Sequence, residues 1–207
     1  MILFEIPIIT FSLISLALII IPGQDLILVM SRSVAQGSKA GVVTALGVSV
    51  GLLGHTILAA LGLGVLLQTS EMLFFVMKIA GGIYLIYLGV KTFRSPPIEL
   101  GATSRVDVSP RAMFFQGALS NLSNPKIAMF YFAFLPQFVS SDAANPTLIL
   151  LMLGSLFAFL TFVVKAPIGY LAGTLSLWLR ARPGVQIWLN RISGTVLIGL
   201  GLRLAYR

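Results

Sequence analysis

The chain is 207 residues long, 57% of them are hydrophobic and only 10% are charged. Soluble domains carry about 25% charged residues, so this chain could not cover the surface of a soluble protein of its size. The absence of cysteine excludes disulfides, thiol redox chemistry and thiolate metal ligands. The net charge of +8 does not indicate a nucleic-acid partner, because most lysines and arginines lie beside apolar runs, where they would orient membrane spans. The composition predicts an integral membrane protein.

Six segments are apolar enough to cross the hydrocarbon core, which takes about 20 helical residues. In chain order they are Ile6–Met30, Gly41–Leu67, Met72–Val90, Ala112–Leu135, Thr147–Leu179 and Ile192–Tyr206. The first lacks the basic region and the cleavage site of a signal peptide, so we expect it to be retained. The fifth is too long for a perpendicular span, so we expect tilt or an interfacial extension. The short sixth leaves room for an earlier start, near Val185.

A proline-rich stretch with mixed charges divides the chain. It defines a first half, 1–94, a linker loop, 95–111, and a second half, 112–207. The stretch Gly82–Lys91 matches Gly194–Arg203 at a constant offset, with both glycines and the terminal cation in register. Three spans per half is an odd number, so the halves would cross in opposite senses. The sequence therefore predicts an all-α integral membrane protein of six transmembrane helices, built as two inverted-topology three-helix repeats. Chance similarity between Gly- and Leu-rich helices is the alternative.

The first and fourth segments each contain a helix breaker. Pro22 and Gly23 interrupt the first. Pro125, which follows Asn124 and lies four residues beyond Asn121, interrupts the fourth. Proline removes a backbone hydrogen bond, and in lipid the freed carbonyl group must find another partner. A simple kink is the alternative to a functional break.

Charged side chains lie beside both breaks. Asp25 follows the first and Lys126 the second, although a charge near the bilayer midplane costs about 2.5–3.5 kcal/mol. They could neutralise each other in a structural ion pair, or form a polar site between the halves, and a pair that opens for a zwitterion would do both. Lys165, before Pro167, is a further deep cation that could instead snorkel to an interface. His55 lies on a helix face of small residues, where close packing is favoured and a proton relay stays open.

Lysine and arginine are unevenly distributed among the loops. The loops Ser31–Lys39, Lys91–Arg111 and Arg180–Pro183 carry them, whereas the loops after the second and fourth segments carry none. The positive-inside rule predicts that the basic loops face the cytoplasm and both termini the outside, although Arg203 and Arg207 oppose this assignment. We expect a multi-pass protein of the bacterial cytoplasmic, or inner, membrane.

With these motifs in place, the chain resembles the LysE/RhtB family of amino-acid exporters, which includes lysine, homoserine/threonine and leucine efflux proteins. The resemblance covers almost the whole chain and is carried by four stretches, Ile21–His55, Lys78–Arg94, Phe114–Phe138 and Ser193–Ala205. The family's Pro-Gly-x-Asp and Asn-Pro-Lys elements correspond to Pro22, Gly23 and Asp25 and to Asn124, Pro125 and Lys126. Gln24 replaces a frequent proline, and Lys165–Pro167 matches no family element, which bears on substrate identity.

The resemblance implies secondary-active export of an amino acid or a close derivative, driven by the proton gradient. The implied partners are the amino acid, protons and the lipid bilayer, and a homodimer is compatible with it. The residues to which we assign substrate binding or coupling are Asp25, Asn121, Asn124, Lys126, His55 and Lys165.

Three other functions were weighed. An exporter of another small solute or of a cation is the nearest, but one histidine and few carboxylates offer too few ligands for a selective metal site. A membrane enzyme is less favoured, because Gly-x-Ser-x-Gly, His-Glu-x-x-His and paired intramembrane aspartates are absent. An assembly subunit would not need charged helix breaks in matching positions. We therefore expect no enzymatic activity, no cofactor and no metal.

Overall fold

The computed structural model describes residues 2–20, 23–69, 71–97, 108–139 and 143–206. All regular structure in these ranges is helical, which confirms the predicted all-α class. The elements in chain order are α1 (Ile2–Ile20), α2 (Gln24–Gln36), α3 (Ser38–Thr69), α4 (Glu71–Phe93), α5 (Pro110–Leu122), α6 (Pro125–Phe134), the 3₁₀ turn η1 (Leu135–Phe138), α7 (Pro146–Tyr170), α8 (Ala172–Arg180) and α9 (Pro183–Tyr206).

The helix is interrupted at both predicted positions. Gly23 is extended (φ −149°, ψ −178°) and precedes α2, which is bent by 55° from α1. Pro22 lies outside the described residues. At the second break, the Asn124 side chain accepts a hydrogen bond from the Lys126 backbone N–H at 3.1 Å, and Pro125 occupies the first turn of α6. Proline is tolerated there because the first N–H groups of a helix have no partner within it.

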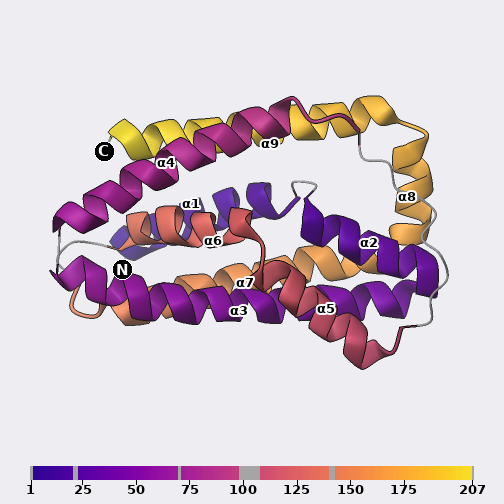
Figure 1. Ribbon diagram of the computed structural model, residues 1–207, viewed down its shortest axis with the longest axis horizontal. Coiled ribbons are helices and arrows are strands. Elements are labelled where there is room, and N and C mark those ends of the chain that lie inside the picture. The colour runs from indigo at the N-terminus through magenta and orange to yellow at the C-terminus, as the bar shows by residue number, and fades with distance from the viewer. Residues whose placement is uncertain (1, 21–22, 70, 98–107, 140–142, 207) are drawn as a thin grey trace.

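The helices run back and forth along one axis. In Figure 1, α1 and α2 run from left to right, α3 returns, α4 runs to the right, α5 and α6 return, α7 runs to the right and α9 returns. The short α8 lies across the right end and joins α7 to α9. The start of α1 and the end of α9 therefore lie at the same end of the bundle.

The largest helix contacts join the two halves of the chain. They pair α3 with α7, α4 with α9 and α3 with α5. The α4–α9 contact, which we call the glycine seam, consists of the two stretches that match each other in sequence. A Cβ atom on Gly194 would lie 2.5 Å from the Gly89 carbonyl oxygen, and one on Gly201 would lie 2.6 Å from that of Gly82. The matching glycines thus permit antiparallel backbone contact.

Part of the predicted set of spans is present as long apolar helices. Among the described residues, three stretches could each cross a membrane, Ser38–Leu63, Pro146–Tyr170 and Pro183–Arg203, and the bent pair of Ile8–Ile20 with Gln24–Gln36 is a fourth candidate. The chain is thus a multi-pass membrane protein. The third and fourth predicted segments are not among these candidates. In the fourth, the break leaves helices of only 13 and 10 residues.

Two predicted segments have other bounds in the structure. The sixth begins before Ile192, with α9 starting at Pro183, close to the earlier start near Val185 that its short length indicated. The fixed φ and missing N–H of Pro183 suit the first turn of a helix. The fifth is not one helix to Leu179, because α7 ends at Tyr170 and α8 starts at Ala172 in a new direction. Pro167 lies in the last turn of α7.

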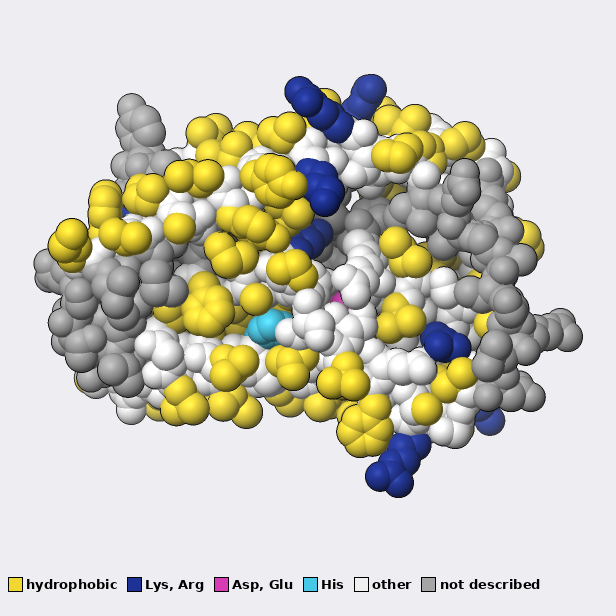
Figure 2. All heavy atoms as spheres, viewed as in Figure 1, with side chains coloured by type: hydrophobic (Ala, Val, Ile, Leu, Met, Phe, Trp, Pro, Cys, Tyr) yellow, Lys and Arg dark blue, Asp and Glu magenta, His cyan; other side chains and the backbone are white. Residues whose placement is uncertain are grey.

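The exterior of the bundle is apolar. Hydrophobic side chains are spread widely over the described part of the face shown in Figure 2, and large ones such as Leu61, Ile83 and Phe159 are each 63% exposed. Inside, α1, α6 and α7 enclose an aromatic cluster of Phe11, Phe130, Tyr131, Phe134 and Phe157. An apolar exterior around a packed interior is the arrangement that a lipid environment favours.

Candidate functional site

The two helix breaks meet at an enclosed polar cavity. Its polar lining comes from both sides of the breaks and from the middle of α7: Gln24, Asp25, Asn121, Asn124, Lys126, Thr161 and Lys165. The remaining wall is largely apolar, with Leu52, Phe130 and Leu197 among its members. The cavity measures about 40 Å³, enough for a few water molecules. The predicted site residues near the breaks are thus brought together in one place.

Asp25 is the centre of this site. It lies in the first turn of α2 and is 4% exposed. A helix N-terminus stabilises negative charge, which offsets part of the cost of burying a carboxylate there. One of its oxygens, Oδ2, accepts a hydrogen bond from Asn121 Nδ2 at 2.7 Å and lies 3.5 Å from Lys165 Nζ. Asp25 is therefore held by one residue of α5 and one of α7.

The expected ion pair has a different partner. We considered a pair between Asp25 and Lys126, but the salt bridge of Asp25 is with Lys165. The sequence could not show this, because the choice depends on α7 crossing directly over the first break. Lys165 also does not snorkel to an interface, since it is only 6% exposed. Lys126 lines the same cavity and has no acidic partner within 4 Å among the residues that the structure describes.

Two asparagines hold the second break. Asn124 caps α6 and is 7% exposed. Asn121 is fully buried and connects two groups: its side chain donates to Asp25, and its carbonyl oxygen lies 3.0 Å from His55 Nε2. His55 is thus connected to the Asp25 carboxylate only through Asn121, and it does not line the cavity. Its ring lies 5.6 Å from that of Tyr131.

Three buried oxygens of the cavity wall have no hydrogen-bond partner within the part of the chain that the structure describes. They are Asp25 Oδ1, Asn121 Oδ1 and Thr161 Oγ1. Buried polar atoms without a partner are rare in folded proteins. Three in one cavity, beside the unpaired ammonium group of Lys126, make a surface that can bind a small molecule carrying both an N–H donor and an anion.

Sequence reasoning missed two residues of this region. Thr161 lies four positions before Lys165, and that spacing on a helix places both on one face, so the signal was available. Ser120 accepts a hydrogen bond from Gln24 Nε2 at 3.2 Å across the two breaks, and nothing in the sequence pairs these two residues. Within the described ranges, no cluster of three or more His, Cys, Asp or Glu side chains could hold a metal ion.

Comparison with known proteins identifies the family. The profile of the LysE type translocator family matches residues 16–207. The chain belongs to this family. It is 32% identical to the uncharacterized membrane protein YrhP of Bacillus subtilis, over 90% of this chain and 92% of that protein. It is also 27% identical to a leucine efflux protein of Klebsiella pneumoniae, over 91% of this chain and 89% of that protein. No solved structure matches the fold.

Membership of the LysE type translocators agrees with the structure at a coarse level. A translocator needs membrane-crossing helices and a polar site within them, and this chain has long apolar helices and a buried charged cavity between them. The matched region begins before the first break and contains every residue of the cavity.

Proposed function

We propose that this chain exports an amino acid or a close derivative from the cytoplasm, in exchange for protons. Family membership and the similarity to leucine efflux proteins support transport of this kind. The observation that carries the proposal is the cavity at the two helix breaks, whose wall includes the buried Asp25 and Lys165 and the half-buried Lys126.

The cavity has the groups that a zwitterion requires. The α-carboxylate would bind the ammonium group of Lys126, and the α-ammonium would take the place of Lys165 Nζ at Asp25 Oδ2. Asp25 Oδ1 and Asn121 Oδ1, which have no hydrogen-bond partner among the described residues, would be further acceptors for it. Charge interactions are strong away from water, so a pair of opposite charges on adjacent carbons gains from both contacts. Two lysines against one aspartate give this cavity a positive balance, which disfavours a further cation on the substrate side chain. The apolar wall favours an aliphatic side chain.

The cavity must widen before it can hold an amino acid. At about 40 Å³ it is smaller than any amino acid. A site this small is closed to an amino acid, and Lys165 lies at the place on Asp25 that a substrate ammonium group would take. Opening would separate the two breaks, which few hydrogen bonds join.

Competition for Asp25 would couple the substrate to a proton. Before substrate binds, a protonated Lys165 would neutralise Asp25, whose Oδ2 lies 3.5 Å from its Nζ. When a substrate ammonium group displaces Lys165 from Asp25, Lys165 lies close to two other positive charges, that ammonium group and Lys126. Because like charges repel strongly in a buried site, Lys165 releases its proton. The proton returns to Lys165 when the substrate leaves on the other side. This cycle exchanges one proton for one substrate, and Asn121 and His55 position the carboxylate within it.

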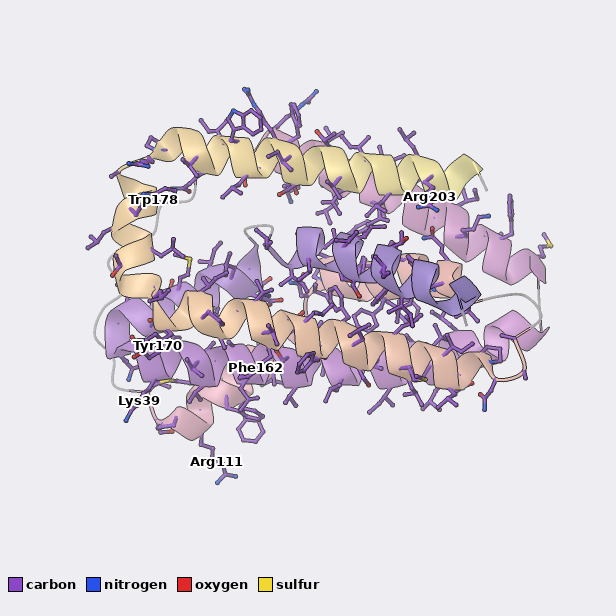
Figure 3. The ribbon with its side chains drawn as sticks, turned by 180° about the vertical axis from the view of Figure 1, so that it is seen from behind. Lys39, Arg111, Phe162, Tyr170, Trp178 and Arg203 are labelled. Atoms are coloured by element: carbon purple, nitrogen blue, oxygen red, sulfur yellow. The ribbon has the colours of Figure 1, made fainter. Side chains whose placement is uncertain are left out.

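We propose that six segments cross the membrane as two inverted repeats. The alternating helix directions of Figure 1 and the antiparallel glycine seam support this arrangement. Figure 3 shows Lys39 and Arg111 at one end of the bundle and Arg203 at the other. We assign the end with Lys39 and Arg111 to the cytoplasm. Single cysteines in the Ser95–Arg111 loop should resist an impermeant thiol reagent in intact cells; labelling there would reverse the assignment.

The proposed function can be tested by exchange of labelled leucine in proteoliposomes. The wild-type protein should exchange leucine, and leucine amide and N-acetyl-leucine should compete poorly, because each lacks one charge of the zwitterion. Lys126→Ala should weaken the binding of leucine by about tenfold, as the loss of a charge-assisted hydrogen bond predicts. It should weaken the binding of leucine amide much less. Equal weakening of both would show that Lys126 only balances charge. Absence of any amino-acid exchange by the wild-type protein would refute the function.

A further inference from the structure

A second, larger hollow lies beside the central cavity. It is a groove between α2 and α5 of about 1200 Å³. Its lining runs along α2 from the first break to near the end of that helix and along α5 to the second break: Gln24, Ile27, Leu28, Ser31, Arg32, Ala35, Val108, Gln116, Leu119, Ser120 and Ser123. Gln24 lines both this groove and the central cavity. The two spaces are therefore neighbours separated at one point by a side chain.

We propose that this groove is the vestibule through which the amino acid enters from the cytoplasmic end, that Arg32 first binds its carboxylate there, and that the hydrogen bond between Gln24 and Ser120 is the gate to the central cavity. The proposal rests on the proposed function, because it assumes that an amino acid is the solute. It adds a second binding site outside the cavity and a defined barrier between the two.

Arg32 is suited to bind a carboxylate. Its side chain is half-buried in the groove, and its Nη2 donates to the neutral Gln116 Oε1 at 2.7 Å. No acidic side chain pairs with it among the described residues. The fixed guanidinium fork leaves other N–H groups for a carboxylate, which it can bind through two parallel hydrogen bonds. Ile27, Leu28 and Leu119 form an apolar wall for the side chain of the bound solute.

The contact between Gln24 and Ser120 has the properties of a gate. Its length is 3.2 Å, and it joins the first residue of α2 to the last turn of α5. A neutral, exposed hydrogen bond is readily exchanged for hydrogen bonds to water, so it opens at low cost. Ser120 is followed by Asn121, which donates to Asp25. Displacement of Ser120 would therefore also shift Asn121, which donates to the Asp25 carboxylate. Entry of the amino acid through the gate would in this way loosen the contacts of Asp25 in the central cavity.

The first test compares two cations at the same end of the bundle. Arg32→Ala should raise the leucine concentration for half-maximal exchange about fivefold, as expected for one partly exposed charged contact. Lys39→Ala is the matched control, since Lys39 is exposed at this end but does not line the groove. Equal effects of the two variants would overturn the role of Arg32.

The second test closes the gate reversibly in this cysteine-free chain. Gln24→Cys/Ser120→Cys is compared with itself in two states. When its cysteines are linked by a short reducible bifunctional thiol reagent, it should exchange leucine at least about tenfold more slowly than when reduced, and reductant should restore the rate of the reduced form. Ser38→Cys/Tyr170→Cys, at the close contact between α3 and α7, is the control link and should leave exchange unchanged. Full exchange by the linked Gln24/Ser120 protein would overturn the gate while leaving the proposed function in place.

A third measurement does not require turnover. Ser31→Cys in the groove should react with a hydrophilic thiol reagent, and leucine should slow that reaction at least about twofold, whereas N-acetyl-leucinamide, which lacks both charges, should not. If leucine has no effect, the vestibule is wrong. If vesicles rich in an anionic phospholipid block the reaction and leucine does not, Arg32 binds a lipid phosphate and the proposal also falls.

Discussion

The two halves of this chain meet in two ways. Along the glycine seam, α4 and α9 touch through backbone and apolar groups, with glycines where a side chain would collide. At the helix breaks, the halves meet through Asp25, Asn121, Lys165, Gln24 and Ser120, around a cavity whose polar atoms are only partly paired. The seam has one well-packed arrangement, whereas the breaks are held by a few polar contacts that a ligand can replace. The comparison suggests that the seam is a fixed frame and the breaks are the part that opens.

The largest expected effect comes from the charges at the breaks. Removing one partner of a buried ion pair costs about 3–5 kcal/mol. Asp25→Asn should be the worse of the two single variants, because it leaves Lys165 and Lys126 together without a carboxylate, whereas in Lys165→Met the nearby Lys126 still balances Asp25. The double variant should be more stable than Asp25→Asn, and all three should lose proton-driven export. Melting temperatures in detergent and export driven by a pH gradient measure the two effects.

Two outcomes would contradict this prediction. Full gradient-driven export by Lys165→Met would show that the proton is not carried by the pair. Equal melting temperatures for the wild-type protein and Asp25→Asn would show that the contact at 3.5 Å contributes nothing to the fold.

The glycine seam should give the next largest effect. Gly194→Val places methyl groups against the Gly89 carbonyl oxygen, where a Cβ atom alone would lie at 2.5 Å. Backbone cannot yield as a flexible side chain can, so the variant should lose about 1–3 kcal/mol of stability or more. Gly199→Val is the matched control on the same helix, because a Cβ atom there would meet nothing within 4 Å. Fluorescence-detected size-exclusion chromatography after heating should show a lower melting temperature only for Gly194→Val.

If both glycine variants melt alike, close backbone contact is not what holds α4 to α9. If Gly194→Val folds normally but exports poorly, the seam moves during transport, and the division into a frame and an opening part is wrong.

The smallest expected effect is at His55, which lies behind Asn121 at the helix breaks. Its ring bonds to the Asn121 carbonyl oxygen and packs against Tyr131. His55→Leu should lose about 1 kcal/mol, the typical net value of one buried hydrogen bond, and reduce export by up to about fivefold. His55→Gln can keep the bond and should export within about twofold of the wild-type rate. Loss of gradient-driven export in His55→Gln, with leucine exchange intact, would instead make His55 a proton relay.

The sequence by itself determined the class of the protein and the positions of its irregular backbone. Apolar runs with few charges can be stable only as helices in lipid. Proline and glycine stop a helix through local sterics, so Gly23 and Pro125 marked both breaks without any tertiary information. The paired glycines likewise marked the helices of the seam, because close helix contact needs small residues at a fixed spacing. The cationic loops indicated an orientation, since that rule also depends on sequence position alone.

Only the tertiary structure decided which charges meet. Asp25 and Asn121 are 96 residues apart along the chain, yet a hydrogen bond of 2.7 Å joins their side chains. The preference for Lys165 over Lys126 depends on where α7 passes the first break, and the contact between Gln24 and Ser120 depends on how α2 lies against α5. Such contacts arise from the packing of whole helices, which is set by many weak interactions at once. Local propensity specifies where a helix stops, but it contains no information about which helix will lie opposite.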